Sequence, residues 1–274
     1  MDSVVLIEEA EIGEIPPTPL SPLTDLSSVA KACALLKKIS KHFGTPTGYK
    51  QEQNGRLIHS ITPDPKTEYI QISSSSKTEL QLHTETAFHP FKPSHILLMC
   101  LRGDPNAYTT YALVDEIVGE LDDWTIDQLS RNAFLTSIDE SFRQNGEQNI
   151  QLKTSILEKS DNGYEMRFDE FFMEGIDDNA KIALINLKTK IPKLTQSISL
   201  KTGDVLILDN KKTIHGRKPF QPRYDGTDRW ILRTLVVDKC PPMSQQTYED
   251  HMIITTDFIQ GTTLDEHPYN WGRK

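Results

Sequence analysis

The feature that most restricts how this chain can fold is a series of short strand-like runs, several of which alternate apolar and polar residues. Segments of this length and pattern are typical of β-strands with one buried face. The runs are RLIHSI (56–61), EYIQIS (68–73), LQLHTE (80–85), SHILLMCL (94–101), IQLKTSIL (150–157), DVLILDN (204–210) and RWILRTLVV (229–237). They do not alternate regularly with helices, as the strands of a parallel sheet do. The pattern therefore predicts a mainly β fold, a sandwich or barrel with helices on the outside.

Helices are predicted in only a few places. Asp25 is expected to cap the first helix, acidic helix-like segments lie at 113–122 and 125–132, and another helix begins at about Asp177. No internal repeat is visible, and no linker divides the chain. We therefore expect a single domain over residues 1–274.

Charge and composition exclude several classes of partner. A net charge of −9 and a pI of about 5.4 argue against a surface for nucleic acid. No apolar run approaches the ~20 residues that span a bilayer, and the acidic start lacks the basic region of a signal peptide. The three cysteines are far apart and odd in number, as expected of reduced thiols. We expect a cytoplasmic protein with neither a nucleic-acid nor a membrane partner.

Two histidines and a glutamate form a candidate metal site. In LQLHTE, His83 and Glu85 are two residues apart, so both side chains project from the same side of an extended segment. His215, just past the run DVLILDN, is the best candidate for a third ligand. Two imidazoles and one carboxylate with open positions are the arrangement of non-haem Fe(II) oxygenases. The H-x-E spacing also occurs on strand faces that bind no metal, so the motif alone leaves both interpretations open.

Two arginines follow His215 at positions that suit an anionic co-substrate. An oxygenase that uses a 2-oxo acid needs a fixed cation for the distal carboxylate, which the planar fork of arginine binds through two hydrogen bonds. Arg229 lies 14 residues after His215, and Arg233 lies four further on, on the same face if the strand is regular. Taken without the histidines, both arginines would be interpreted as surface cations paired with the abundant acids.

Longer segments resemble a known family. HTETAFHP, LRGDPNAYTT and DNKKTIHGRKPFQPRYDGTDRWILR resemble the clavaminate synthase-like group of Fe(II)/2-oxoglutarate oxygenases. Within that group, the chain is most similar to the free-amino-acid hydroxylases of the asparagine oxygenase and arginine 3-hydroxylase type. The resemblance runs from about Ile15 to Val237 and implies a double-stranded β-helix (jelly-roll) core with flanking helices. Members of this group carry a longer N-terminal portion, so we expect a packing layer to be missing or differently supplied.

The resemblance also implies roles for individual residues near the metal. His83, Glu85 and His215 resemble the iron ligands. Arg229 resembles the arginine that binds 2-oxoglutarate, and Thr109 lies where such enzymes place a hydroxyl on the same carboxylate. The implied cofactor and co-substrate are thus Fe(II) and 2-oxoglutarate.

Further residues match positions that contact an amino-acid substrate. Arg233 resembles the residue that holds the α-carboxylate, while Gln53 and Glu85 match positions that take the α-amine, with Gln53 in a loop whose alignment can shift by one residue. Asp169 resembles the residue that contacts the substrate's side chain. Phe171 stands where the arginine hydroxylase has a second acid, which makes arginine a less natural substrate.

The resemblance implies an enzyme, a dioxygenase that hydroxylates an unactivated carbon, most plausibly C3, of a polar L-amino acid or a derivative and releases succinate and CO2. Glu85 as a ligand argues against halogenation, because halogenases of this chemistry leave that position open to halide. Desaturation or cyclisation would use the same ligands. A non-catalytic descendant that binds an amino acid or 2-oxoglutarate is a further alternative, as is a zinc hydrolase, for which no general base is apparent.

Other conspicuous residues receive ordinary interpretations. His89, four residues after Glu85, is expected to be a core histidine or one that supports a ligand. His59, His95 and His251 have no partner at a useful spacing and are interpreted as ordinary. The serine-rich segment 73–77 is predicted to border the substrate pocket. The C-terminal TLDEHPYNWGRK is interpreted as a tail or a flap near the site.

Overall fold

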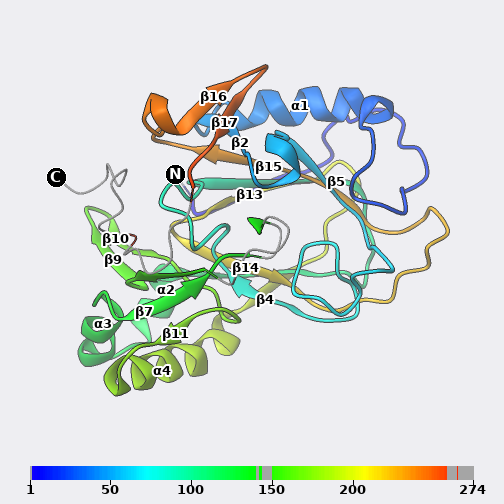
Figure 1. The fold of residues 1–274 in the computed structure, drawn as a ribbon. Coiled ribbons are helices and arrows are strands. Elements are labelled where there is room, and N and C mark those ends of the chain that lie inside the picture. The colour runs from blue at the N-terminus through cyan, green and yellow to red at the C-terminus, as the bar shows by residue number, and fades with distance from the viewer. Residues whose placement is uncertain (1, 140–141, 144–149, 258–263, 265–274) are drawn as a thin grey trace.

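An eight-stranded sheet fills the upper half of Figure 1, in a computed structural model that describes residues 2–139, 142–143, 150–257 and 264. In spatial order its strands are β1 (Val4–Ile7), β13 (Val205–Asp209), β5 (His95–Arg102), β15 (Trp230–Val237), β2 (Thr45–Tyr49), β17 (Met252–Ile254) and β16 (Gln246–Tyr248), and β3 (Ile58–Ile61) also pairs with β15. Within this sheet, only β17 and β2 pair in parallel.

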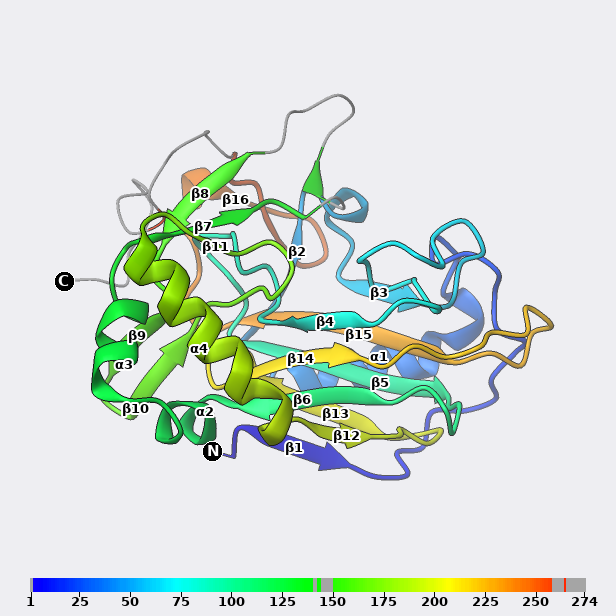
Figure 2. The ribbon, with the colours of Figure 1, turned by 90° about the horizontal axis from the view of Figure 1, so that it is seen from below.

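A four-stranded antiparallel sheet faces the large one (Figure 2). Its order is β12 (Gln196–Ile198), β6 (Thr109–Leu113), β14 (Thr213–Arg217) and β4 (Leu80–His83). Two facing, mostly antiparallel sheets confirm the prediction of a mainly β fold with a jelly-roll core and helices outside it.

The large sheet buries both of its faces, and alternation along β5 and β15 assigns the side chains to one face or the other. Outward residues such as Met99 and Leu232 pack beneath helix α1 (Ala30–Ser40). Inward residues such as Leu98 and Ile231 belong to the core between the two sheets. The inward face of β15 is therefore also the face that carries Arg233.

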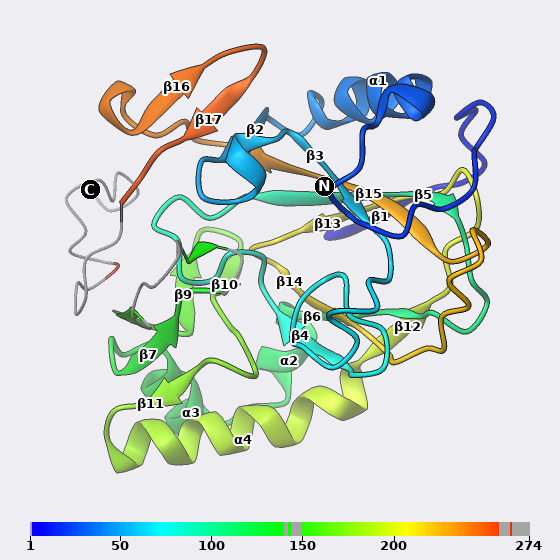
Figure 3. The ribbon, with the colours of Figure 1, turned by 45° about the vertical axis from the view of Figure 1, so that its right-hand side comes forward.

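Helix α4 (Asp178–Leu194) covers the outer face of the smaller sheet, on the opposite side of the molecule from α1 (Figure 3). Its N-cap is Asp177, whose carboxylate accepts from the amide of Ala180, as the acidic start predicted. Two shorter helices, α2 (Val114–Gly119) and α3 (Asp123–Leu129), pack against α4. Together the three helices cover the hydrophobic cluster on the outer face of the smaller sheet, which includes Leu82, Ala112 and Ile214.

Small elements complete the fold. A three-stranded sheet contains β7 (Phe134–Ser137), β8 (Gln151–Thr154) and β11 (Glu174–Gly175), and a hairpin contains β9 (Leu157–Ser160) and β10 (Gly163–Met166). The 3-10 turns are η1 (Ser27–Val29), η2 (Gln53–Gly55) and η4 (Met243–Gln245). Among the described residues, no helix has both the length and the apolar character needed to cross a bilayer.

Three local predictions were wrong. Residues 68–73 form turns instead of a strand, because their amides bond locally, as from Ile70 to the Thr67 carbonyl. The run 150–157 is broken where the Ile156 amide donates to the carbonyl of Leu129. Asp25 accepts from the amide of Ser27 in the turn before α1 and does not cap the α-helix itself. The predicted C-terminal tail or flap lies outside the described residues except for one position.

Candidate active site

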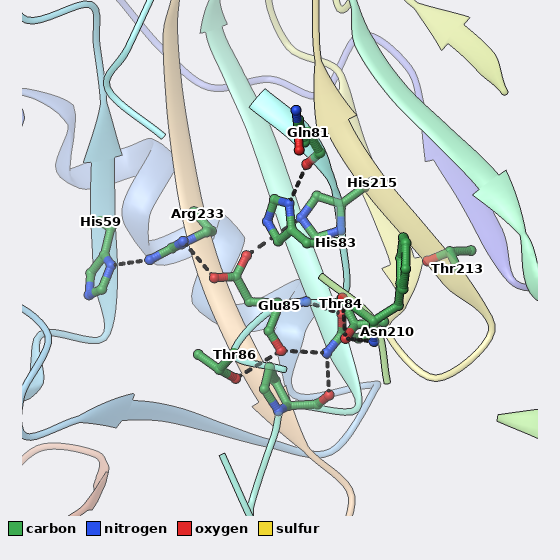
Figure 4. Close-up of polar contacts among 12 residues, drawn as sticks. His59, Gln81, His83, Thr84, Glu85, Thr86, Asn210, Thr213, His215 and Arg233 are labelled. Carbon is green, nitrogen blue, oxygen red and sulfur yellow. Dashed lines mark hydrogen bonds and ion pairs between the residues drawn. The ribbon is translucent and has the colours of Figure 1, made fainter. Parts of the chain in front are cut away.

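His83, Glu85 and His215 meet between the two sheets (Figure 4). His83 and His215 are direct partners in the β4–β14 pairing, and their ring centroids are 4.5 Å apart. Each of the three residues offers one ligand atom, and these atoms all lie within 4.8 Å of one another. Strand β4 ends at His83, so Glu85 reaches the group from a turn in which Thr86 has a positive φ of 48°. The convergence of all three therefore depends on this turn as well as on strand alternation.

The protonation of the group suits a divalent cation. His83 Nδ1 lies 2.8 Å from the carbonyl of Gln81, a contact that fixes the ring orientation. His215 Nε2 lies 3.5 Å from a carboxylate oxygen of Glu85. Burial lowers the pKa of His215, which favours the neutral imidazole that binds metals. Burial alone would raise the pKa of Glu85, but Arg233 and His215 hold that pKa well below its usual range. Two imidazoles and an ionised carboxylate fit Fe(II) in donor type and number.

Asn210 fixes the backbone of Glu85. Its side-chain oxygen accepts from the Glu85 amide at 2.7 Å, and its nitrogen donates to the carbonyls of Glu85 at 3.1 Å and Pro93 at 2.8 Å. Asn210 is fully buried, so loss of these bonds would leave polar groups unpaired. The turn that carries Glu85 is thus held from the end of β13.

Arg233 is the centre of a buried ionic network on the other side of Glu85. Its guanidinium donates to Glu85 at 2.9 Å and to Glu52, and it lies 2.7 Å from Nδ1 of His59. His59 Nε2 contacts the carbonyl of Arg56, so Nδ1 is free to accept from Arg233. The two glutamates outweigh the effect of burial and raise the pKa of Arg233. Arg233 is therefore a permanent cation beside the candidate ligands His83, Glu85 and His215, which we call the metal-ligand group.

This network corrects the interpretation of His59. His59 is not an ordinary surface histidine but a buried partner of Arg233 and a neighbour of Glu52 at 3.3 Å. Gln53 lines the same cavity, yet Glu52 is the residue that contacts Arg233. A shift of the family alignment by one residue, from Gln53 to Glu52, therefore replaces an amide with a carboxylate next to Arg233.

Arg229 and Thr109 line the same cavity as Arg233. Arg229 Nη2 donates to the Thr109 hydroxyl at 3.1 Å, and both residues are buried. Burial lowers the pKa of Arg229, and burial together with the charge of Arg229 lowers the pKa of Arg217 to about 9. Two neighbouring guanidinium groups in a buried site create a strong positive potential. An anion bound beside them would be stabilised.

One cavity of about 400 Å³ is lined by the three candidate metal ligands, by Arg233 with Glu52 and His59, and by Arg217, Arg229 and Thr109. Asp169 lines it from the segment after β10, where its Oδ1 accepts from the amides of Phe171 and Phe172. Phe171 also lines the cavity, at the outer rim, and is 55 % exposed. Ser73 and Ser74 line the wall, as the prediction for segment 73–77 required.

His89 behaves as predicted for a core histidine. It is fully buried beside the rings of Tyr49 and Phe142 and does not belong to the metal-ligand group. No motif in the sequence marks Glu52, Asn210 or Asp139, and His59 has no partner at a useful spacing there. Only the proximity of Glu52 to Gln53 offered a signal, since the other three belong to no spaced motif.

A jelly-roll with two histidines and a carboxylate around one point is the arrangement of mononuclear non-haem Fe(II) oxygenases. Residues 144–235 match the model of the taurine catabolism dioxygenase TauD, TfdA family. The chain is 33 % identical to the L-asparagine oxygenase of Streptomyces coelicolor, over 81 % of this chain and 67 % of that protein. It is 30 % identical to clavaminate synthase 2 of Streptomyces clavuligerus, over 84 % and 71 %. The chain therefore belongs to this family of Fe(II)/2-oxoglutarate-dependent amino-acid oxygenases.

Other relatives agree with this membership. The L-lysine 3-hydroxylase of Catenulispora acidiphila is 30 % identical over 83 % of this chain, which spans 64 % of that relative. Asparagine oxygenase in complex with Fe(II), 3-hydroxyasparagine and succinate superposes with a TM-score of 0.79 at 31 % identity, over 86 % of this chain and 75 % of that one. The oxygenase OrfP with Fe and α-ketoglutaric acid gives 0.77 at 31 % identity, over 87 % and 75 %.

Proposed function

We propose that this protein hydroxylates an unactivated carbon, C3, of a polar L-amino acid or a derivative, with Fe(II) as cofactor and 2-oxoglutarate as co-substrate. The observation that carries the proposal is that a single cavity is lined by the metal-ligand group His83, Glu85 and His215 together with the two buried arginines Arg229 and Arg233. Fe(II) bound there would supply, with O2, the oxidising power, and 2-oxoglutarate would be converted into succinate and CO2.

In this proposal, Arg229 and Thr109 hold the distal carboxylate of 2-oxoglutarate. The fork of Arg229 suits a carboxylate, and the Thr109 hydroxyl adds a donor within reach of the same anion. Arg217, which pairs with Thr109 across strands β14 and β6, adds positive potential to the same part of the cavity. The co-substrate is thereby fixed relative to the metal by groups on β6, β14 and the start of β15.

The other half of the cavity would hold the amino acid as a zwitterion. Arg233 offers its guanidinium to the α-carboxylate, and Glu52 and Glu85 offer carboxylate oxygens to the α-amine. Gln53 lines the cavity beside Glu52, and its Oε1 has no hydrogen-bond partner among the described residues. Such fixed contacts at both α-substituents orient C3 reproducibly, which is what a regioselective oxidation requires. The solved relatives with 3-hydroxyasparagine and (3S)-hydroxy-L-Arg support C3 as the oxidised position.

The test has an anaerobic and an aerobic step. Protein with Fe(II) and 2-oxoglutarate should show the absorption band of the Fe(II)–2-oxoglutarate complex, and the substrate among the twenty amino acids should shift that band. Admission of O2 should then give succinate and a product carrying one added oxygen atom in equal amounts. Binding without succinate would support a non-catalytic descendant, and a product with two fewer hydrogens and no added oxygen would indicate desaturation. Either result would contradict the proposal.

A further inference from the structure

We infer, on the basis of the proposed function, that the substrate is an L-amino acid with a cationic side chain, whose amine or guanidine group lies between Asp139 and Asp169. Asp169 follows β10, and Asp139 follows β7, so the two aspartates come from separate segments of the chain. Both line the cavity that contains the metal-ligand group. Phe171 occupies the position where the arginine hydroxylase has a second acid, and in this protein Asp139 would take the place of that acid.

The two aspartates have oxygen atoms available for a ligand. Asp169 uses Oδ1 for the amides of Phe171 and Phe172, while its Oδ2 has no hydrogen bond to any described residue. Asp139 lines the cavity, and its carboxylate makes no hydrogen bond or ion pair within the described part of the chain. Carboxylates elsewhere in the cavity, those of Glu52 and Glu85, are already paired with Arg233. Among the described residues of the cavity wall, the carboxylates that form no ion pair are therefore those of Asp139 and Asp169.

The charges along the cavity wall favour a cation. The wall carries four carboxylates, Glu52, Glu85, Asp139 and Asp169, and three guanidinium groups, Arg217, Arg229 and Arg233. Fe(II) and the dianion of 2-oxoglutarate cancel each other, and the α-groups of a zwitterion do so as well. With all four acids ionised, a neutral side chain leaves one negative charge in excess, whereas a cationic side chain balances that charge and allows Asp139 to ionise.

The local electrostatics point the same way. Burial and the negative charge of Asp169 raise the pKa of Asp139 well above its usual range, because two buried carboxylates repel each other when both are ionised. A bound ammonium or guanidinium group relieves that repulsion and donates to both acids. The amide of asparagine or glutamine donates two hydrogen bonds but carries no charge, so it would leave the repulsion between the two acids uncompensated. The pair of acids therefore discriminates against amides as well as against apolar side chains.

The first experiment measures binding to the full chain loaded anaerobically with Fe(II) and 2-oxoglutarate. Calorimetry and the absorption band would compare L-lysine, L-ornithine and L-arginine with L-asparagine, L-glutamine and L-norleucine, which has the lysine skeleton without its terminal amine. We expect the best basic amino acid to bind at least about tenfold more tightly than any of the neutral three, since a charged hydrogen-bonding group would otherwise be left unpaired. Equal or tighter binding of asparagine, glutamine or norleucine would overturn the inference.

The second experiment uses Asp139→Asn, with Asp161→Asn in the exposed β9–β10 turn as the matched control. In D139N, the affinity of the protein for the basic amino acid should fall by about tenfold or more, while the affinity of the protein for 2-oxoglutarate stays unchanged. D161N should change neither affinity. Asp169→Asn should show the same selectivity. An unchanged preference in both D139N and D169N would refute the assignment. If wild-type protein forms no Fe(II)–2-oxoglutarate band, the proposed function itself fails, and the inference fails with it.

Discussion

The two ends of the cavity are built in different ways. At the metal end, His83, His215 and Arg233 lie in hydrogen-bonded strands, and the last two are only 5 % and 6 % exposed. At the side-chain end, Asp139, Asp169 and Phe171 lie in connecting segments, and Phe171 is 55 % exposed. At the metal end both acids, Glu52 and Glu85, are paired with Arg233, whereas Asp139 and Asp169 form no ion pair with any described residue.

This difference separates the reaction from its specificity. A ladder of hydrogen bonds holds a side chain within a few tenths of an ångström of its neighbours, which metal and co-substrate binding require. Loops on such a scaffold tolerate substitution, so they are where one member of a family can differ from the next. Substitutions of the metal ligands should therefore abolish chemistry of every kind, and those at the side-chain end should change only which amino acid is oxidised.

The largest effect is expected at the metal-ligand group. His83→Ala, Glu85→Ala and His215→Ala should each abolish succinate formation and reduce bound iron, because a site with two ligands holds the metal poorly. Each loss should exceed the roughly 10–100-fold that removal of a residue supporting a ligand costs. His42→Ala, at an exposed histidine, is the control. Full activity of the His215 variant, measured together with its iron content, would show that the third ligand is misassigned.

The next effect separates chemistry from specificity at Asp169. In Asp169→Ala, turnover of the preferred amino acid should fall by about 10–100-fold, because a buried donor of the substrate loses its charged acceptor. Consumption of 2-oxoglutarate without amino-acid product should persist, since the metal end is intact. Parallel measurement of succinate and hydroxylated product tests this. If both fall together, Asp169 acts on the metal end and the division between the two ends is wrong.

Within the metal end, the two arginines should give opposite phenotypes. Arg229→Lys keeps the charge but loses the planar fork, so the KM for 2-oxoglutarate should rise by about tenfold or more while iron binding stays normal. Arg233→Lys should instead raise the KM for the amino acid. Steady-state kinetics with each substrate varied in turn would decide, and exchanged phenotypes would mean that the roles along β15 are reversed.

The smallest effect is expected for Thr109→Val, which removes the hydroxyl that accepts from Arg229 and preserves the shape of the side chain. Loss of one such hydrogen bond costs about 1 kcal/mol, so the KM for 2-oxoglutarate should rise by about fivefold. Thr110→Val, at the neighbouring position of β6, is the matched control. No change in the Thr109 variant would indicate that the hydroxyl only orients Arg229.

The sequence determined the parts of the site that follow from backbone periodicity. Alternation along an extended strand fixes which side chains share a face, so the spacing of Arg229 and Arg233 was enough to assign both to one side of the strand. His83 and Glu85 come together as the same rule predicted, but Glu85 lies beyond the end of β4 and reaches the group from a turn. Helix α4 was equally predictable, because Asp177 and its acidic neighbour mark an N-terminus locally.

Only the tertiary structure decided which distant loops close the cavity. His59 meets Arg233 because β3 pairs with β15, and Asp139 meets the cavity because β7 pairs with β11 near the Asp169 segment. Neither contact leaves a trace in local spacing, since it depends on how sheets separated by many residues pack against each other. Residues 68–73 have the alternating pattern of a strand, yet they form turns because their amides make local hydrogen bonds. Periodicity is a property of one segment, whereas a binding pocket is a property of several segments folded together.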